Sequence, residues 1–231
     1  MNFKYLSFYF TIKLLALGFS FASEDENKSN FPAMQKISDS TYLFGQVIID
    51  QKERFLEFNA TTNQTNGLIE YALVHEDGKT HESLFRTKVR PQIIHACLLL
   101  LKIPVEERFF KNLWSEEPQE IDFRKSSIVT EVFWEQNGTT VTKSLENLAL
   151  NSKNQKNLQE GVFIFTGSKK IEDTYLAEMS GSIIAVYADE EAVINSSDHD
   201  SNNDDVWLAN AKEMPELEVP VKVRFLLPKL Q

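Results

Sequence analysis

The stretch Pro91–Ile103, PQIIHACLLLLKI, is the clearest helix signal in the sequence. Proline suits the first position of a helix, where no backbone N–H is needed, and Pro104 cannot continue one. The residues between the two prolines leave almost no polar face, which predicts a helix that is buried nearly all round. Such a helix must lie against a sheet or against other helices.

Strand patterns precede this helix. Residues 45–50, 54–59 and 68–75 are rich in apolar side chains. Over residues 55–60, Phe55, Glu57 and Asn59 alternate with Leu56, Phe58 and Ala60. Alternation of this kind is typical of a strand with one covered face. The pair Asp77-Gly78 is a strong hairpin signal, so we expect residues 80–85 to return antiparallel to the third strand.

Strand patterns also follow the helix, after a short second helix expected over residues 106–114. Asn137-Gly138, between two β-rich runs, is the best hairpin signal in the chain. Further strands are expected at residues 162–166, 182–187 and 219–227. Because helices do not alternate with strands, the sequence predicts an α+β, strand-rich fold with antiparallel sheets and one buried helix at about residues 91–103.

The first 22 residues have the features of a secretory signal peptide. A lysine precedes a mostly apolar segment without acids, and small residues stand where cleavage after Ala22 would need them. We therefore expect an exported protein, periplasmic or secreted. The expected organisation is a signal peptide at 1–22, a flexible lead-in at 23–43 and a domain at 44–228, which allows two packed halves, 44–115 and 120–228.

The composition restricts the partners and cofactors. Lys and Arg total 24 against 34 Asp and Glu, so the formal net charge is −10, whereas nucleic-acid binding requires clustered cations. The single cysteine, Cys97, excludes an internal disulfide and any site built from four cysteines. After the signal peptide, no apolar run reaches the roughly 20 residues that span a bilayer.

His81, Glu82 and His95 are the most suggestive candidates for chemistry. Two imidazoles and a carboxylate suit a divalent metal ion. The short connection at residues 86–90 should bring the helix that carries His95 close to the strand that carries His81 and Glu82. On a regular strand, however, Glu82 points away from His81. The trio therefore permits three interpretations: a structural polar cluster that ties helix to sheet, a metal-binding site, or a catalytic site.

A second candidate is an acidic loop with oxygen-bearing side chains at alternate positions, as in a calcium loop: Asp198, Asp200, Asn202 and Asp204. The EF-hand pattern needs glycine at its sixth position and glutamate at its twelfth. Here these positions hold Asn203 and Ala209, and alanine supplies no ligand. A solvated acidic loop is the alternative interpretation.

Several short motifs occur in a characteristic order: GLIEY at 67–71, HESL at 81–84, EVFWE at 131–135, FTGS at 165–168, GSIIAVY at 181–187 and DDVWLAN at 204–210. In this order the sequence resembles the YdjY-domain family, exported bacterial proteins of which many come from the Planctomycetes–Verrucomicrobia group. The resemblance covers about residues 44–228 and implies no established activity.

We therefore expect an exported protein of non-enzymatic function, either a binding module or an envelope-associated interaction module. Its partner would be an envelope protein or a small ligand. The alternative is a metal-dependent enzyme or metal-binding protein that uses His81, Glu82 and His95 to hold a divalent ion.

Overall fold

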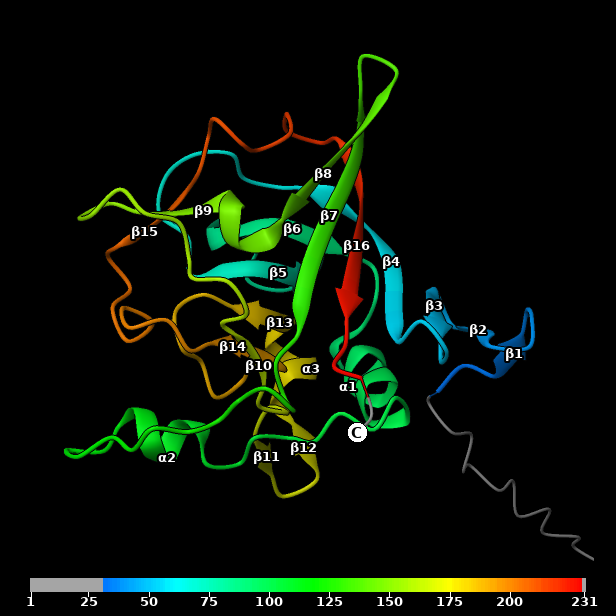
Figure 1. Ribbon diagram of the computed structural model, residues 1–231, viewed down its shortest axis with the longest axis horizontal. Helices are drawn as coiled ribbons and strands as arrows, with labels where there is room; N and C mark the ends of the chain where they lie inside the picture. The colour runs from blue at the N-terminus through cyan, green and yellow to red at the C-terminus, as the bar shows by residue number, and fades with distance from the viewer. Residues whose placement is uncertain (1–30, 230–231) are drawn as a thin grey trace, which may run out of the picture. The chain divides into compact units, whose positions relative to one another are not determined.

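The chain is built mainly of strands. The computed structural model describes residues 31–229; the expected signal peptide at 1–22 and residues 23–30 lie outside them. In the described part, nine strands follow one another across the main sheet (Figure 1): β1 (Met34–Lys36), β2 (Thr41–Phe44), β3 (Val47–Asp50), β4 (Phe55–Thr62), β6 (Ser83–Thr87), β5 (Tyr71–His75), β13 (Ser182–Ala185), β14 (Ile194–Ser196) and β10 (Phe163–Phe165). The predicted strand-rich α+β class is confirmed.

Strand β4 is the centre of the sheet. Along one edge it pairs over its length with β16 (Pro220–Leu226). Along the other edge it pairs with β3 at its start and with β6 at its end. β16 in turn pairs with β7 (Val129–Gln136), which forms a hairpin with β8 (Thr139–Ser144). Asn137 and Gly138 both have positive φ, 52° and 75°, so the predicted tight hairpin is confirmed.

The hairpin predicted at Asp77-Gly78 is wrong, because β5 and β6 run parallel. Neither Asp77 nor Gly78 has the positive φ that a tight hairpin turn requires. Residues 76–82 instead cross over, and their last three form the 3₁₀ helix η1 (Thr80–Glu82). β13 and β14 are also parallel, so the main sheet is mixed rather than antiparallel.

Gly78 is needed for a close approach between two backbones. A Cβ at this position would lie 2.7 Å from the carbonyl oxygen of Ser180 and 2.9 Å from the Cα of Gly181. Real Cβ atoms do not approach other atoms so closely. The crossover therefore rests directly on the chain that follows helix α3 (Leu176–Ser180).

Helix α1 (Pro91–Leu100) begins at the predicted proline and contacts α3 and β13. Ile94, Cys97 and Leu98 are fully buried. The expectation of burial nearly all round is wrong, because Leu99 and Leu100 are each about half exposed, at 50% and 49%. The helix is also shorter than predicted, since it ends at Leu100. The chain turns there, and backbone hydrogen bonds close the last turn of the helix.

The remaining elements are short. They comprise helix α2 (Phe109–Leu113), the 3₁₀ helix η2 (Leu145–Leu148), and two small sheets that pair β9 (Ala149–Asn151) with β15 (Trp207–Ala209) and β11 (Lys170–Ile171) with β12 (Thr174–Tyr175). The core holds large side chains from several strands, among them Phe85, Phe163, Phe225 and Trp207.

The expectation of a flexible lead-in needs correction, and the pairing of the two expected halves can be described. The lead-in expected at residues 23–43 contains strands β1 and β2, because they pair in sequence with β3 and so extend the main sheet. The two expected halves, 44–115 and 120–228, share the main sheet. β4 and β5, from the first half, pair directly with β16 and β13, from the second, and the chain from Phe31 onward clusters as one unit.

Candidate functional site

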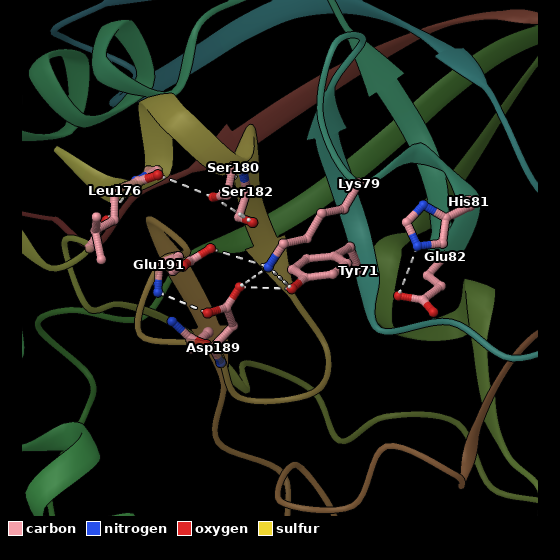
Figure 2. A network of polar contacts seen from close by, with 12 residues as sticks. Tyr71, Lys79, His81, Glu82, Leu176, Ser180, Ser182, Asp189 and Glu191 are labelled. Carbon is pink, nitrogen blue, oxygen red and sulfur yellow. Dashed lines mark hydrogen bonds and ion pairs between the residues drawn. The ribbon is translucent and has the colours of Figure 1, made fainter. Parts of the chain in front are cut away.

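A polar network lies where β5 begins and β13 ends (Figure 2). Tyr71 is the first residue of β5, and its antiparallel partner is Ala185, the last residue of β13. Lys79 lies in the crossover from β5 to β6, and Asp189 and Glu191 lie in the crossover from β13 to β14. The two crossovers thus bring side chains from distant parts of the sequence to one end of the sheet. We call Tyr71, Lys79, Asp189 and Glu191 the Lys79 network.

The ammonium group of Lys79 has three oxygen partners. Its Nζ lies 2.7 Å from the hydroxyl of Tyr71, 3.1 Å from Oδ2 of Asp189 and 3.2 Å from Oε2 of Glu191. An ammonium group has three N–H donors, so these contacts use all of them. Nζ also lies 5.0 Å from the centroid of the Tyr71 ring. The positive charge of Lys79 is therefore fully satisfied by the protein.

Asp189 is fixed from both sides. Its Oδ2 accepts a hydrogen bond from the Tyr71 hydroxyl at 2.7 Å, and its Oδ1 accepts one from the backbone N–H of Glu191 at 2.9 Å. Its own N–H donates to the side-chain oxygen of Asn195. Asn195 is fully buried and donates to Thr166. The network is therefore anchored in the core and rigid.

Both proton donors of the network hold their protons firmly. Burial raises the pKa of Tyr71, which is only 2% exposed. Burial by itself lowers the pKa of Lys79, but the hydrogen bond with Tyr71 and the charge of Asp189 outweigh it, so the pKa of Lys79 lies above its ordinary value. A general base must give up its proton near the working pH. Neither residue is suited to that role at neutral pH.

A cavity of about 440 Å³ opens beside the Lys79 network. We call it the acidic pocket, because four acids and two lysines line it: Glu70, Asp189, Glu190, Glu191, Lys79 and Lys169. Both lysines already have acidic partners, since Lys169 pairs with Glu190 at 2.8 Å. Tyr187 adds an aromatic side chain to the lining. The pocket therefore carries a surplus of negative charge.

Glu70 is the acid of this pocket that no cation contacts directly. Among the described residues its carboxylate has no hydrogen-bond or ion-pair partner. Burial raises the pKa of Glu70, and the nearby negative charges of Glu82 and Asp204 raise it further, whereas the charge of Lys79 lowers it in part. A cation placed beside Glu70 would relieve both effects.

The structure separates the predicted trio. His81 and Glu82 face one another in η1, with 3.6 Å between Nε2 and Oε2, and the His81 side chain is 74% exposed (Figure 2). His95 instead lies on α1, with its Nδ1 2.7 Å from the Tyr175 hydroxyl and its ring edge-to-face with Phe165. Burial lowers the pKa of His95, helped by the charge of Lys170. The expectation that Glu82 or His81 would be the partner of His95 is therefore corrected. The partner is Tyr175, which lies on β12 (Thr174–Tyr175).

Within residues 31–229, no group of three or more His, Cys, Asp and Glu side chains is arranged to hold a metal ion. His81, Glu82 and His95 are accordingly not gathered around one point. A divalent ion bound by these residues stays a prediction, which elemental analysis of the purified protein tests directly.

The loop that contains Asp198, Asp200, Asn202 and Asp204 is partly buried rather than fully solvated. Asp198, which is 3% exposed, accepts a hydrogen bond from the backbone of Gln159. Asp200 accepts one from the side chain of Asn151 at 2.7 Å. His199 contacts both carboxylates. These two acids thus hold the loop against the neighbouring chain, and calcium binding stays a prediction.

Sequence reasoning did not single out the Lys79 network. Its members lie far apart in the sequence, 118 residues between Tyr71 and Asp189, and each looks ordinary in its own segment. Lys79 directly follows Asp77-Gly78, whose local pattern predicts a hairpin turn. The run Asp189-Glu190-Glu191, shortly after the buried strand β13, was the available signal, because the ends of parallel strands often carry functional side chains.

Comparisons with known proteins identify the family but no activity. No curated protein and no solved structure matches the chain. Among the described residues, no helix has the length and apolar character needed to cross a membrane. The YdjY domain family matches residues 47–226, from the first residue of β3 to the last residue of β16, and this range includes the whole Lys79 network. The match spans most of the chain, which therefore belongs to the YdjY domain family.

Proposed function

We propose that this protein is exported and serves as a non-catalytic binding module, in which the acidic pocket takes the cationic group of a small ligand or of an envelope partner. The observation that carries the proposal is the charge balance of the pocket. Its two lysines are already paired, whereas Glu70 has no partner. The free charge of the site is therefore negative.

The rigidity of the Lys79 network supports binding rather than catalysis. Because Tyr71 and Lys79 both retain their protons, the network presents fixed charges instead of a group that exchanges protons. Fixed, preorganised polar groups lower the cost of binding, because few side chains must be ordered when the ligand arrives. An amine or guanidinium group next to Glu70 would also meet the aromatic ring of Tyr187.

Support for export comes from the N-terminal sequence pattern alone. Intact-mass measurement of the protein recovered outside the cytoplasm tests it. We expect a chain that begins at Ser23, and a recovered chain with residues 1–22 still attached would contradict cleavage.

Calorimetric titration with putrescine and with arginine amide tests the binding function. We expect binding that weakens as salt is added, because the attraction is electrostatic. Glu70→Gln should weaken it about fivefold. Glu120→Gln, an exposed acid away from the pocket, removes the same charge and should change nothing. No binding of either cation, or equal affinities for the two variants, would contradict the proposal.

A further inference from the structure

Arg54 is a buried cation without a carboxylate partner. Its side chain lines a cavity of about 440 Å³ and the residue is only 8% exposed. Its Nε donates to the carbonyl oxygen of Pro228 at 2.5 Å, and among the described residues it makes no ion pair. A buried charge is normally paired, because its desolvation is costly. Arg54 thus lacks the group that would ordinarily balance it.

Asp50, at the end of β3, and Asp122, in the lining of the cavity, are already engaged. Asp50 accepts backbone N–H groups of Lys52 and Glu53 on one oxygen, and its other oxygen accepts two hydroxyl groups. Asp122 lines the same cavity but is held by Arg124 through two N–H groups, at 2.6 and 2.8 Å. Neither acid is free to neutralise Arg54.

The backbone at Arg54 is also in an unfavourable conformation. Arg54 is the last residue of the turn between β3 and β4, and its φ is +56°. Glycine adopts this left-handed region without steric cost, whereas a residue with a Cβ does not. Glycine would therefore serve the turn better and would remove the buried charge. Strain combined with an unpaired charge points to a role other than stability.

Four more cations line the same cavity, and they come from three other parts of the chain: Lys102, Arg124, Lys125 and Lys229. Lys102 follows the C-cap residue of helix α1 and has a φ of +58°, again in a position that glycine usually holds. Arg124 and Lys125 precede β7, and Lys229 follows β16. Five cations and a single, already paired acid thus meet in a protein whose net charge is −10. We call this cavity the basic pocket.

We propose that the basic pocket binds a small anion that carries a phosphate group, with the guanidinium of Arg54 as its buried anchor. A guanidinium presents a planar fork of N–H donors that matches phosphate oxygens, and lysines add point charges around it. The volume lies within the range of small-molecule sites. The basic and acidic pockets share no lining residue, so this inference is independent of the cationic ligand proposed above.

Titration of the full chain with pyrophosphate at low salt tests the proposal. We expect saturable binding that Arg54→Gln weakens about tenfold or more and that Arg54→Lys restores in part. Arg90→Gln is the matched control, since it removes one arginine charge at the opposite end of α1 and should leave the affinity unchanged. Equal affinities of Arg54→Gln and Arg90→Gln would overturn the proposal.

A second variant tests the pocket even if Arg54→Gln fails to fold. Lys125→Gln combined with Lys229→Gln changes two exposed side chains and should weaken pyrophosphate binding while the melting temperature stays constant. Co-sedimentation with phosphatidylglycerol vesicles distinguishes the source of the phosphate. Arg54-dependent binding to vesicles but not to pyrophosphate would assign the site to a lipid headgroup, and binding to neither would overturn the inference.

Discussion

Lys79 and Arg54 are two cations in similar places with opposite surroundings. Each lies in a short connection between strands, Lys79 between β5 and β6 and Arg54 between β3 and β4. Lys79 is a third exposed yet has two acids and a phenol around it, whereas Arg54 is nearly buried and has one carbonyl oxygen. Burial alone therefore does not reveal the role of a charge. The number of its partners separates a structural cation from one that is available to a ligand.

The largest effect should come from removing the satisfied cation. Lys79→Met leaves Asp189, Glu191 and the Tyr71 hydroxyl close together without their shared donor, so we expect a loss of about 2–4 kcal/mol in the free energy of unfolding. Urea denaturation measures it. The control is Lys143→Met, which breaks a pair with Glu213 at a lysine of similar exposure that has a single acid partner, and it should cost about 1 kcal/mol or less. Similar losses in both variants would contradict the distinction.

The position of Lys79 depends on the close approach at Gly78. Gly78→Ala places a Cβ against the backbone of Ser180 and Gly181, so one of the two chains must move. We expect a loss of about 1–3 kcal/mol, as for other overpacked sites. Gly138→Ala, where nothing lies within 4 Å, tests strain without a clash and should cost less. A crystal structure of Gly78→Ala with Lys79 still in place would show that the approach does not position the network.

His95 provides an intermediate case, since it is a buried base held without an opposite charge. Its pKa in the folded protein lies below the ordinary histidine value of 6.5, so the unfolded chain takes up a proton first as the pH falls. The contribution of His95 is therefore fully present above about pH 6.5 and is lost as the pH falls toward the folded pKa. Melting temperatures between pH 7.5 and 5 should fall more steeply for the wild type than for His95→Gln. Parallel curves would contradict burial of a neutral imidazole.

The smallest effect should come from removing the unsatisfied cation. Arg54→Gly relieves both the left-handed backbone and the desolvated charge, and loses one hydrogen bond to Pro228. We expect an unfolding free energy within about 1 kcal/mol of the wild type, without ligand. Denaturation in phosphate-free buffer measures it. A large loss of stability would mean that Arg54 is structural after all and would remove the contrast with Lys79.

Local patterns predicted the parts of the fold that local physics decides. The alternation in β4, the proline at the start of α1 and the Asn137-Gly138 turn all appear as expected. The parallel pairing of β5 and β6 was missed because Asp77-Gly78 also satisfies a hairpin pattern. What selects the crossover is the contact of Gly78 with Gly181, more than 100 residues away, which no local window contains.

The candidate sites were harder to predict for a related reason. β14 has only three residues, too few to show a period, so the crossover from β13 to β14 that carries Asp189 could not be recognised. The predicted trio paired histidines by their type and sequence separation. In the structure these residues have different partners: His95 contacts the Tyr175 hydroxyl, and Glu82 contacts His81.

The place of β16 has a consequence for the order in which the molecule folds. This strand lies between β4 and β7, and its Arg224 binds Glu57, 167 residues earlier in the chain. Until β16 is available, two long strands keep an unpaired edge, and such edges readily join other chains. The pairing of β4 and β7 with β16 must wait for the C-terminal strand, so we expect folding to be slow and to be completed in a single late step. An isolated peptide of residues 219–228 should for the same reason act as a competitor while the chain folds, by occupying the gap before its own strand arrives.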